Sequence, residues 1–193
     1  MKPILRDFPY SFETKRLTIR GPLPGDGLEL FTAVTESQAE LKPWMPWAVN
    51  IPDAEAHEVR VREGQLKFLA REDLWLMLLL KGTNTIIGGS GLHRLDWDVP
   101  KFEIGYWVRT SYARQGYITE AVTGITSFAF DVLGAQRVEI RCDAKNTRSA
   151  AVPRRLDFVL EGVIRCDDRH HLTNELRDTL LFSKIRRDGD RLI

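Results

Sequence analysis

The segment between residues 101 and 144 constrains the fold most, because it reads as a strand, a loop, a helix and a strand in direct succession. "KFEIGYWVR" (101–109) and "RVEIRCDA" (137–144) alternate apolar and polar residues, a pattern typical of strands. Between them, a loop with a single glycine, Gly116, leads into an apolar helix that we expect to end at Gly134. This order requires helices packed in a layer against a sheet, which is an α/β structure.

Further strands are expected at 16–21 and 175–185, and "LWLMLLL" (74–80) with "TIIGGSGL" predicts a hairpin that turns at "KGTN". We therefore expect a single α/β layer structure with a mixed sheet, in one domain that spans residues 1–193.

Helices are expected after Asp26 and over 53–73, with Asp26 and Asp53 as N-caps. "TRSAAVPRRLDFVLEG" predicts a helix, interrupted or opened by Pro153, that runs into a short strand. The proline-broken segment 41–52 excludes regular helix.

Charge and composition exclude several classes of function. The net charge of +1 gives no overall field for binding nucleic acid or an anionic membrane. The longest apolar run, 74–80, is too short to span a bilayer, and the N-terminal segment lacks the apolar core of a signal peptide, so we expect a cytoplasmic protein. Two cysteines, Cys142 and Cys166, form no disulfide framework, and no residue spacing suggests a metal site.

The glycine of "YARQGYITEA" (112–121) has two explanations. Gly116 could simply make a turn. Alternatively, the loop could present its N–H groups and the positive end of the following helix to an anion. The excess of basic residues over 137–155 likewise indicates either a solvated face or a ligand that carries phosphate. The loop is neither a P-loop nor a dinucleotide fingerprint, because the Lys-Ser or Lys-Thr pair and two further glycines are missing.

Four segments together resemble one known family. "EIGYWVRTSYARQGYITEAV" (103–122) is similar to the acyl-CoA-binding segment of the GNAT acetyltransferase superfamily, in its RimJ/RimL branch of ribosomal-protein N-terminal acetyltransferases. "ETKRLTIRGPLPGD" (13–26), "RVEIRCDAKNTRSAAVPRRLDFVLEG" (137–162) and "ELRDTLLFSKI" (175–185) resemble further parts of that branch, in the expected order. The resemblance implies a mixed, mostly antiparallel sheet that is splayed in the middle and flanked by helices, with a core from about 14 to 187.

The resemblance implies that acetyl-CoA is bound and that the loop N–H groups hold its pyrophosphate. The family pattern falls on 113–118, where Ala113 and Ile118 depart from it and Gly116 matches. Asp157 replaces an expected glycine, and aspartate tolerates a left-handed backbone better than most residues. Asn146 is implied to bind the pantetheine arm, although an ordinary turn residue is the alternative. The implied cofactor-binding residues are Val108, Arg109, Arg114, Gln115, Gly116, Tyr117, Ile118, Thr119, Asn146 and Ser149.

Three residues are candidates for the catalytic chemistry. Ser149 matches the serine that donates a proton to the leaving thiolate in this branch, or it caps a helix. Glu103 is a candidate base acting through water, or an outward carboxylate. Asp168, in "RCDDRHH", is a second candidate base, or a solvated loop residue. The resemblance places the donor to the thioester carbonyl at the backbone N–H near Val108.

The acceptor pocket is expected at Trp44, Trp47 and His93, with the segment 163–175 on its other side. The two tryptophans could instead seal the core, and His93 could be structural. The implied reaction is acetyl transfer from acetyl-CoA to a primary amine by direct attack in a ternary complex. The primary expectation is that the acceptor is the N-terminal α-amine of a protein, with a ribosomal protein as one candidate. A small-molecule N-acetyltransferase and a non-catalytic acyl-CoA-binding module are the alternatives, and a homodimer is possible.

Overall fold

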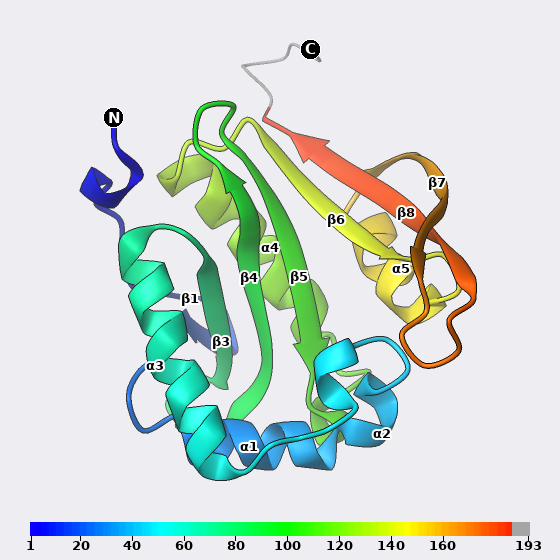
Figure 1. Cartoon of the computed structure of the whole chain (residues 1–193). Helices are drawn as coiled ribbons and strands as arrows, with labels where there is room; N and C mark the ends of the chain where they lie inside the picture. The colour runs from blue at the N-terminus through cyan, green and yellow to red at the C-terminus, as the bar shows by residue number, and fades with distance from the viewer. Residues whose placement is uncertain (187–193) are drawn as a thin grey trace.

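The computed structural model describes residues 1–186, which form one eight-stranded sheet with helices on both faces (Figure 1). The strand order is β1-β2-β3-β4-β5-β6-β8-β7, and every neighbouring pair is antiparallel except β5 and β6. The predicted α/β fold with a mixed, mostly antiparallel sheet is thus confirmed. The expected core ended near residue 187, and that position lies outside the described residues.

The strands are β1 (Ser11–Glu13), β2 (Leu17–Arg20), β3 (Leu74–Leu80), β4 (Ile86–Asp96), β5 (Lys101–Val108), β6 (Arg137–Asp143), β7 (Val159–Arg169) and β8 (Leu176–Ile185). The helices are α1 (Gly27–Glu36), α2 (Gln38–Leu41), α3 (Ala54–Ala70), α4 (Tyr117–Ser127) and α5 (Thr147–Arg155).

The sheet opens between β5 and β6, as expected. Parallel pairing joins only Lys101–Glu103 to Arg137–Glu139, although β5 continues to Val108 and β6 to Asp143. Figure 1 shows the two strands diverging beyond this short contact. Because β6 continues its pairing with β8 instead, the edge of β5 that faces β6 is left without a partner strand beyond Glu103.

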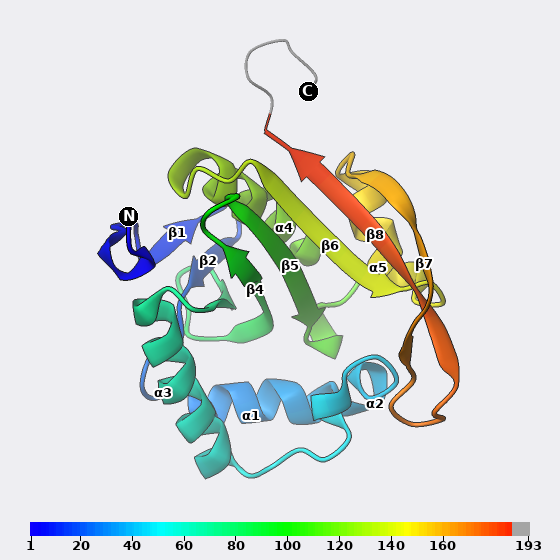
Figure 2. The same ribbon diagram turned by 45° about the horizontal axis from the view of Figure 1, so that its top comes forward.

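Two apolar cores lie on opposite faces of the sheet. One core lies between the sheet and α4, and the other lies between the sheet, α1 and α3 (Figure 2). β3 contributes to both cores, since Leu76 and Leu78 belong to the first and Met77 and Leu79 to the second. A strand covered on both faces needs apolar residues on both, which explains the uninterrupted run "LWLMLLL".

The ends of α4 follow the glycine signals. Gly116 takes a φ of 79° at the N-cap, and the chain continues beyond α4 as a π-helical turn over Phe128–Val132. Gly134 takes a φ of 74° directly after this turn. Both glycines therefore adopt the left-handed conformation that other residues adopt at a cost, and the predicted helix is confirmed.

The two predicted aspartate caps differ in outcome. Asp53 accepts a hydrogen bond from the N–H of Ala56 and caps α3 as expected. Asp26 precedes α1, but its side chain makes no cap bond. Its carboxylate instead accepts hydrogen bonds from both terminal nitrogens of Arg20, at 2.7 Å, and from the N–H of Leu23. Asp26 does not cap the helix because its side chain is engaged by this nearby guanidinium.

The region after α5 differs from the prediction. The strand expected to be short is β7, which runs for 11 residues. The segment 163–175, expected to be irregular, is therefore strand up to Arg169, and only its remainder forms the turn to β8. β7 pairs with β8 along most of its length, with two register shifts. This pairing makes β7 longer than its own sequence indicates. Asp157 has a φ of 57°, as expected for a residue in the place of a glycine.

Candidate active site

The loop before α4 exposes backbone N–H groups at the start of a helix. Arg114 and Gly116 both take left-handed backbone conformations, with φ of 61° and 79°. Within the described chain, the N–H groups of residues 114–119 donate to no backbone or side-chain acceptor. Free amides at the start of a helix, together with its positive dipole end, provide a site for a phosphate.

Arg16 holds this loop in place, which the sequence pattern did not indicate. Its Nε lies 2.6 Å from Glu120 of α4, and its Nη1 donates to the carbonyl of Gln115 at 3.0 Å. The guanidinium also lies over the ring of Tyr117, 4.1 Å from the centroid. One side chain from the residue just before β2 therefore holds the loop and the first turn of α4 in place.

The side chain of Arg109 is paired with α1. Its guanidinium contacts two carboxylates of α1, Glu29 at 2.8 Å and Glu36 at 2.5 Å. Although burial lowers the pKa of Arg109, these carboxylates outweigh it and raise the pKa above its ordinary value. The Arg109 side chain therefore joins the end of β5 to α1, and only its backbone is left for the predicted cofactor contact. Thr119 of α4 accepts a hydrogen bond from Arg155 of α5 at 3.2 Å.

A small pocket of about 170 Å³ fills the gap between β5 and β6. Its lining includes Ile104 and Tyr106 from β5, Cys142 from β6, and Asn146 and Ser149 from the start of α5. Trp44 also lines it, from the proline-rich segment. The N–H of Arg109 donates toward β4, to Ile87 at 2.8 Å, so the neighbouring N–H of Val108 faces the open gap instead.

Ser149 and Tyr106 are linked inside this pocket. The Ser149 hydroxyl donates to the Tyr106 hydroxyl at 3.3 Å, and Tyr106 in turn donates to the backbone carbonyl of Ser149 at 2.8 Å. That carbonyl is free because Pro153, four residues later, has no N–H to donate to it. Burial raises the pKa of Tyr106 well above its ordinary value, so its hydroxyl stays protonated.

Asn146, rather than Ser149, is the cap of α5. Its side-chain oxygen accepts the N–H of Ser149 at 3.0 Å. The capping role considered for Ser149 is therefore wrong, and its hydroxyl instead faces Tyr106. The Asn146 oxygen is used by the cap, which leaves its amide NH₂ to donate toward the pocket.

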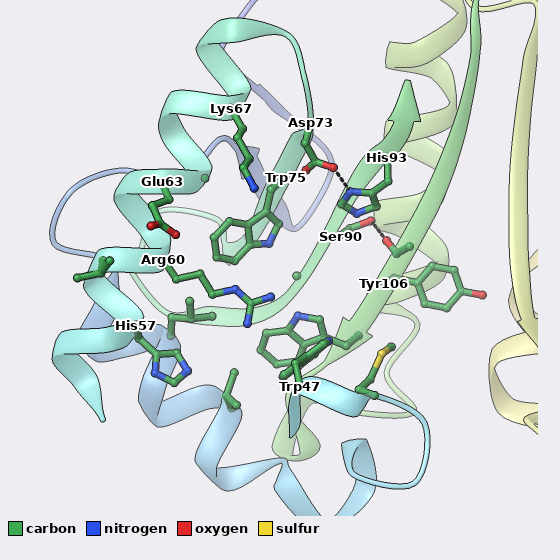
Figure 3. Close-up of a pocket in the computed structure, with 18 of the residues that line it drawn as sticks. Trp47, His57, Arg60, Glu63, Lys67, Asp73, Trp75, Ser90, His93 and Tyr106 are labelled. Atoms are coloured by element: carbon green, nitrogen blue, oxygen red, sulfur yellow. Dashed lines mark hydrogen bonds and ion pairs between the residues drawn. The ribbon is translucent and has the colours of Figure 1, made fainter. Parts of the chain in front are cut away.

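A second and larger pocket, of about 680 Å³, lies on the face of the sheet that α1 and α3 cover (Figure 3). Trp47, Trp75 and Trp107 supply indole rings to its wall, and His93 lines it as well. Trp47 and Trp107 pack edge to face with centroids 6.0 Å apart. Met45, Gly105 and Tyr106 line both pockets, so the two meet at the middle of β5. Trp44 and Trp47, predicted to share one wall, thus face different pockets.

Asp73 and His93 form a pair at the edge of the larger pocket. Asp73 Oδ2 lies 2.7 Å from His93 Nδ1, which leaves the other ring nitrogen free (Figure 3). A Cβ at Gly91 would lie 2.7 Å from that nitrogen, Nε2, so the glycine makes room for the ring. The carboxylate fixes the orientation of the imidazole.

The two predicted carboxylate bases lie elsewhere. Glu103 is held between Arg94 at 3.1 Å and Arg141 at 3.7 Å, and burial raises its pKa against the effect of these arginines. Asp168 is exposed on β7, where Arg177 at 2.6 Å lowers its pKa. Neither lines the small or the large pocket. The structure therefore gives neither carboxylate access to an amine in these pockets.

The segment 163–175 reaches the proline-rich segment but not the pockets. His170 and His171 contact the carbonyls of Pro43 and Lys42, at 3.0 Å and 2.8 Å. No residue of 163–175 lines either pocket. Among residues 1–186, no cluster of side chains could hold a metal ion, and no helix is long and apolar enough to cross a membrane.

Comparisons with known proteins agree with this arrangement. A family model described as "Acetyltransferase (GNAT) domain" matches residues 16–159. YdaF from Bacillus subtilis (strain 168), which is named provisionally as a ribosomal N-acetyltransferase, is 29% identical over 91% of this chain and 94% of its own length. The ribosomal-protein-serine acetyltransferase of Escherichia coli (strain K12) is 25% identical over 75% of this chain and 80% of its own.

Solved structures share the fold. The microcin C7 self-immunity acetyltransferase MccE, in complex with acetyl-CoA and AMP, superposes with a TM-score of 0.85 at 20% identity, over 93% of this chain and 98% of that one. RimL, a ribosomal-protein alpha-N acetyltransferase in complex with coenzyme A, superposes with a TM-score of 0.81 at 20% identity. The match covers 92% of this chain and 96% of that one. The family match, the splayed sheet and the loop of free amides agree with one another. This chain therefore belongs to the GNAT acetyltransferase family and is an enzyme that uses acetyl-CoA as its co-substrate.

Proposed function

We propose that the protein transfers an acetyl group to the α-amine at the N-terminus of a protein, by direct attack in a ternary complex. The meeting of the two pockets at Tyr106 is the observation that carries this proposal. The small pocket suits a thioester in the gap, and the large one is open to an amine from the opposite face. The names of the B. subtilis and E. coli relatives support a ribosomal protein as the acceptor, and hence a cytoplasmic reaction.

The residues of the chain fit acetyl-CoA along one path. The N–H groups of 114–119 would bind the pyrophosphate, which is the role expected for that loop. The Asn146 amide would donate to the pantetheine arm within the gap between β5 and β6. The co-substrate supplies an activated acetyl carbonyl, and the N–H of Val108 faces the gap where negative charge would develop on that oxygen.

The protons then have defined routes. As the amine nitrogen bonds to the acetyl carbon and the carbon–sulfur bond breaks, the amine must lose a proton and the thiolate must gain one. His93 Nε2 would take the amine proton, directly or through a water, with Asp73 holding the ring. Ser149 Oγ would give a proton to the thiolate and regain one from water.

Replacing Ser149 with alanine is expected to lower kcat by about 10- to 10³-fold, the range for loss of a positioned proton donor. The Kd for acetyl-CoA and the Tm should change little, because Asn146 keeps its cap bond to the backbone N–H of residue 149. Steady-state kinetics, calorimetry and thermal melting of the variant measure these three quantities. An unchanged kcat would mean that Ser149 does not protonate the leaving group.

A small-molecule amine is the second candidate acceptor. The larger pocket, at about 680 Å³, falls within the range of pockets that enclose small ligands, and its indoles suit an apolar or aromatic body. The test is acetyl transfer to a panel of peptides that differ in their N-terminal residues, together with amine drugs and polyamines. We expect peptides to be acetylated at the α-amine with the highest kcat/KM. Preferential turnover of a small amine would favour the second candidate, and no turnover at all would contradict both.

A further inference from the structure

Arg60 of α3 projects into the larger pocket (Figure 3). Together with Glu63, Gly64 and Lys67 it forms one face of α3, because residues three, four and seven apart lie on the same side of a helix. Its guanidinium carbon lies 5.5 Å from the ring centroid of Trp47 and 5.5 Å from that of Trp75. Two indoles from separate segments thus hold the charged group in place.

The positive charge of Arg60 has no counterion among the residues that the structure describes. Within residues 1–186 its guanidinium forms no ion pair and no hydrogen bond, whereas Arg109 and Arg137 each contact two carboxylates. Although the residue as a whole is exposed, partial burial of its guanidinium lowers the pKa of Arg60, and no carboxylate opposes this shift. Glu63 lines the same pocket without pairing with Arg60, and Asp73 is engaged by His93.

We propose that Arg60 forms a carboxylate subsite in the acceptor pocket, so that the preferred acceptor carries an acidic group near its reacting amine. Aromatic contacts hold the guanidinium while its N–H edges stay free, which suits bidentate binding of a planar carboxylate. A single negative charge fits better than a phosphate dianion, because Glu63 and Asp73 also line the cavity. This inference rests on the proposed function and narrows its substrate class.

The carboxylate can come from two sources. It can be the side chain of aspartate or glutamate in the first residues of a protein N-terminus, or the α-carboxylate of a small amino compound. The experiment compares peptides with glutamate or glutamine at the second, third or fourth position, and small amino acids with their carboxamides. For wild type we expect kcat/KM to be about 10- to 100-fold higher for the acidic member of at least one pair, the range for a hydrogen bond to a charged group. The pair that shows this preference identifies the source.

Two variants separate this subsite from general effects of charge. Arg60→Met should abolish the preference for the acidic member, measured as the ratio of the kcat/KM values for the two members of the pair. Arg62→Met is the matched control on the same helix, because Arg62 is exposed, pairs with Glu58 and lines neither pocket. It should keep the full preference.

The possible failures can be told apart. Equal turnover of acidic and neutral acceptors by wild type would overturn the subsite, even if Arg60→Met proves too unstable to assay. A preference that persists in Arg60→Met would also overturn it. Failure to acetylate any acceptor in the panel would instead count against the proposed function itself.

Discussion

Replacing Gly116 with aspartate is expected to weaken acetyl-CoA binding by at least about 100-fold, because a negative charge would stand among the amides that would bind the pyrophosphate. Crowding within the protein is not the reason. A Cβ at this position would meet only Arg16 Nη2, at 3.6 Å. The loss of affinity should therefore come from repulsion between the aspartate and the phosphates, and from a Cβ that stands where the phosphates would approach the loop. Titration calorimetry with acetyl-CoA measures this effect.

Two controls isolate that cause. Gly82→Asp introduces the same residue at a φ of 77°, where a Cβ would meet nothing within 4 Å, so it matches the backbone strain far from the loop. It should lower the Tm to a similar degree and leave acetyl-CoA affinity unchanged. Gly116→Ala adds the Cβ without the charge and should give an intermediate affinity. A Kd for Gly116→Asp within about threefold of wild type would place the pyrophosphate elsewhere.

Local sequence signals predicted the elements whose causes are local. Gly116 and Gly134 marked the ends of a helix because a left-handed residue is required there, and Asp53 marked a cap three residues before the amide that it binds. The divergence of the sheet between β5 and β6 was predicted only from the family resemblance. It depends on β6 pairing with β8 across its full length, and a reading of single segments does not contain that information.

The errors at the site arise from partners that are distant in sequence. Arg109 ends a predicted strand next to the loop, but its ion pairs are with Glu29 and Glu36, more than 70 residues away. Asp168 was expected in a loop, and the pairing of β7 with β8 makes it a strand residue opposite Arg177. Neither partner could be inferred from the neighbouring residues.

Two missed residues had a usable signal. Asp73 precedes the predicted hairpin, and the pairing of Leu74 with Leu92 puts it beside His93. Tyr106 shares a strand face with Ile104, and that strand directly precedes the loop, so it was a candidate for the cleft. Arg16 had no such signal, since its contact with Glu120 depends on how β2 packs against α4.

The pair of Asp73 and His93 leads to the second large effect. His93→Gln is expected to lower kcat at pH 7 by about 10²-fold or more, the usual contribution of a positioned base. An α-amine titrates near pH 8, so most of it carries a proton to be lost at pH 7. The KM for the acceptor should change by less than about threefold, since glutamine keeps a polar group of similar size.

The pH dependence and two further variants distinguish a base from a structural role. Raising the pH to about 9 deprotonates the amine without help and should restore part of the activity of His93→Gln. Asp73→Asn should reduce kcat less than His93→Gln does. The asparagine oxygen can still accept a hydrogen bond from the ring, and only the negative charge beside the ring is lost. His57→Gln is the control, because Figure 3 shows His57 across the pocket from His93, with its Nδ1 already bonded to the carbonyl of Asp53. Its kcat should stay within about threefold of wild type. A His93→Gln variant whose KM rises while kcat is retained would make His93 a binding residue, and the amine would then lose its proton to water.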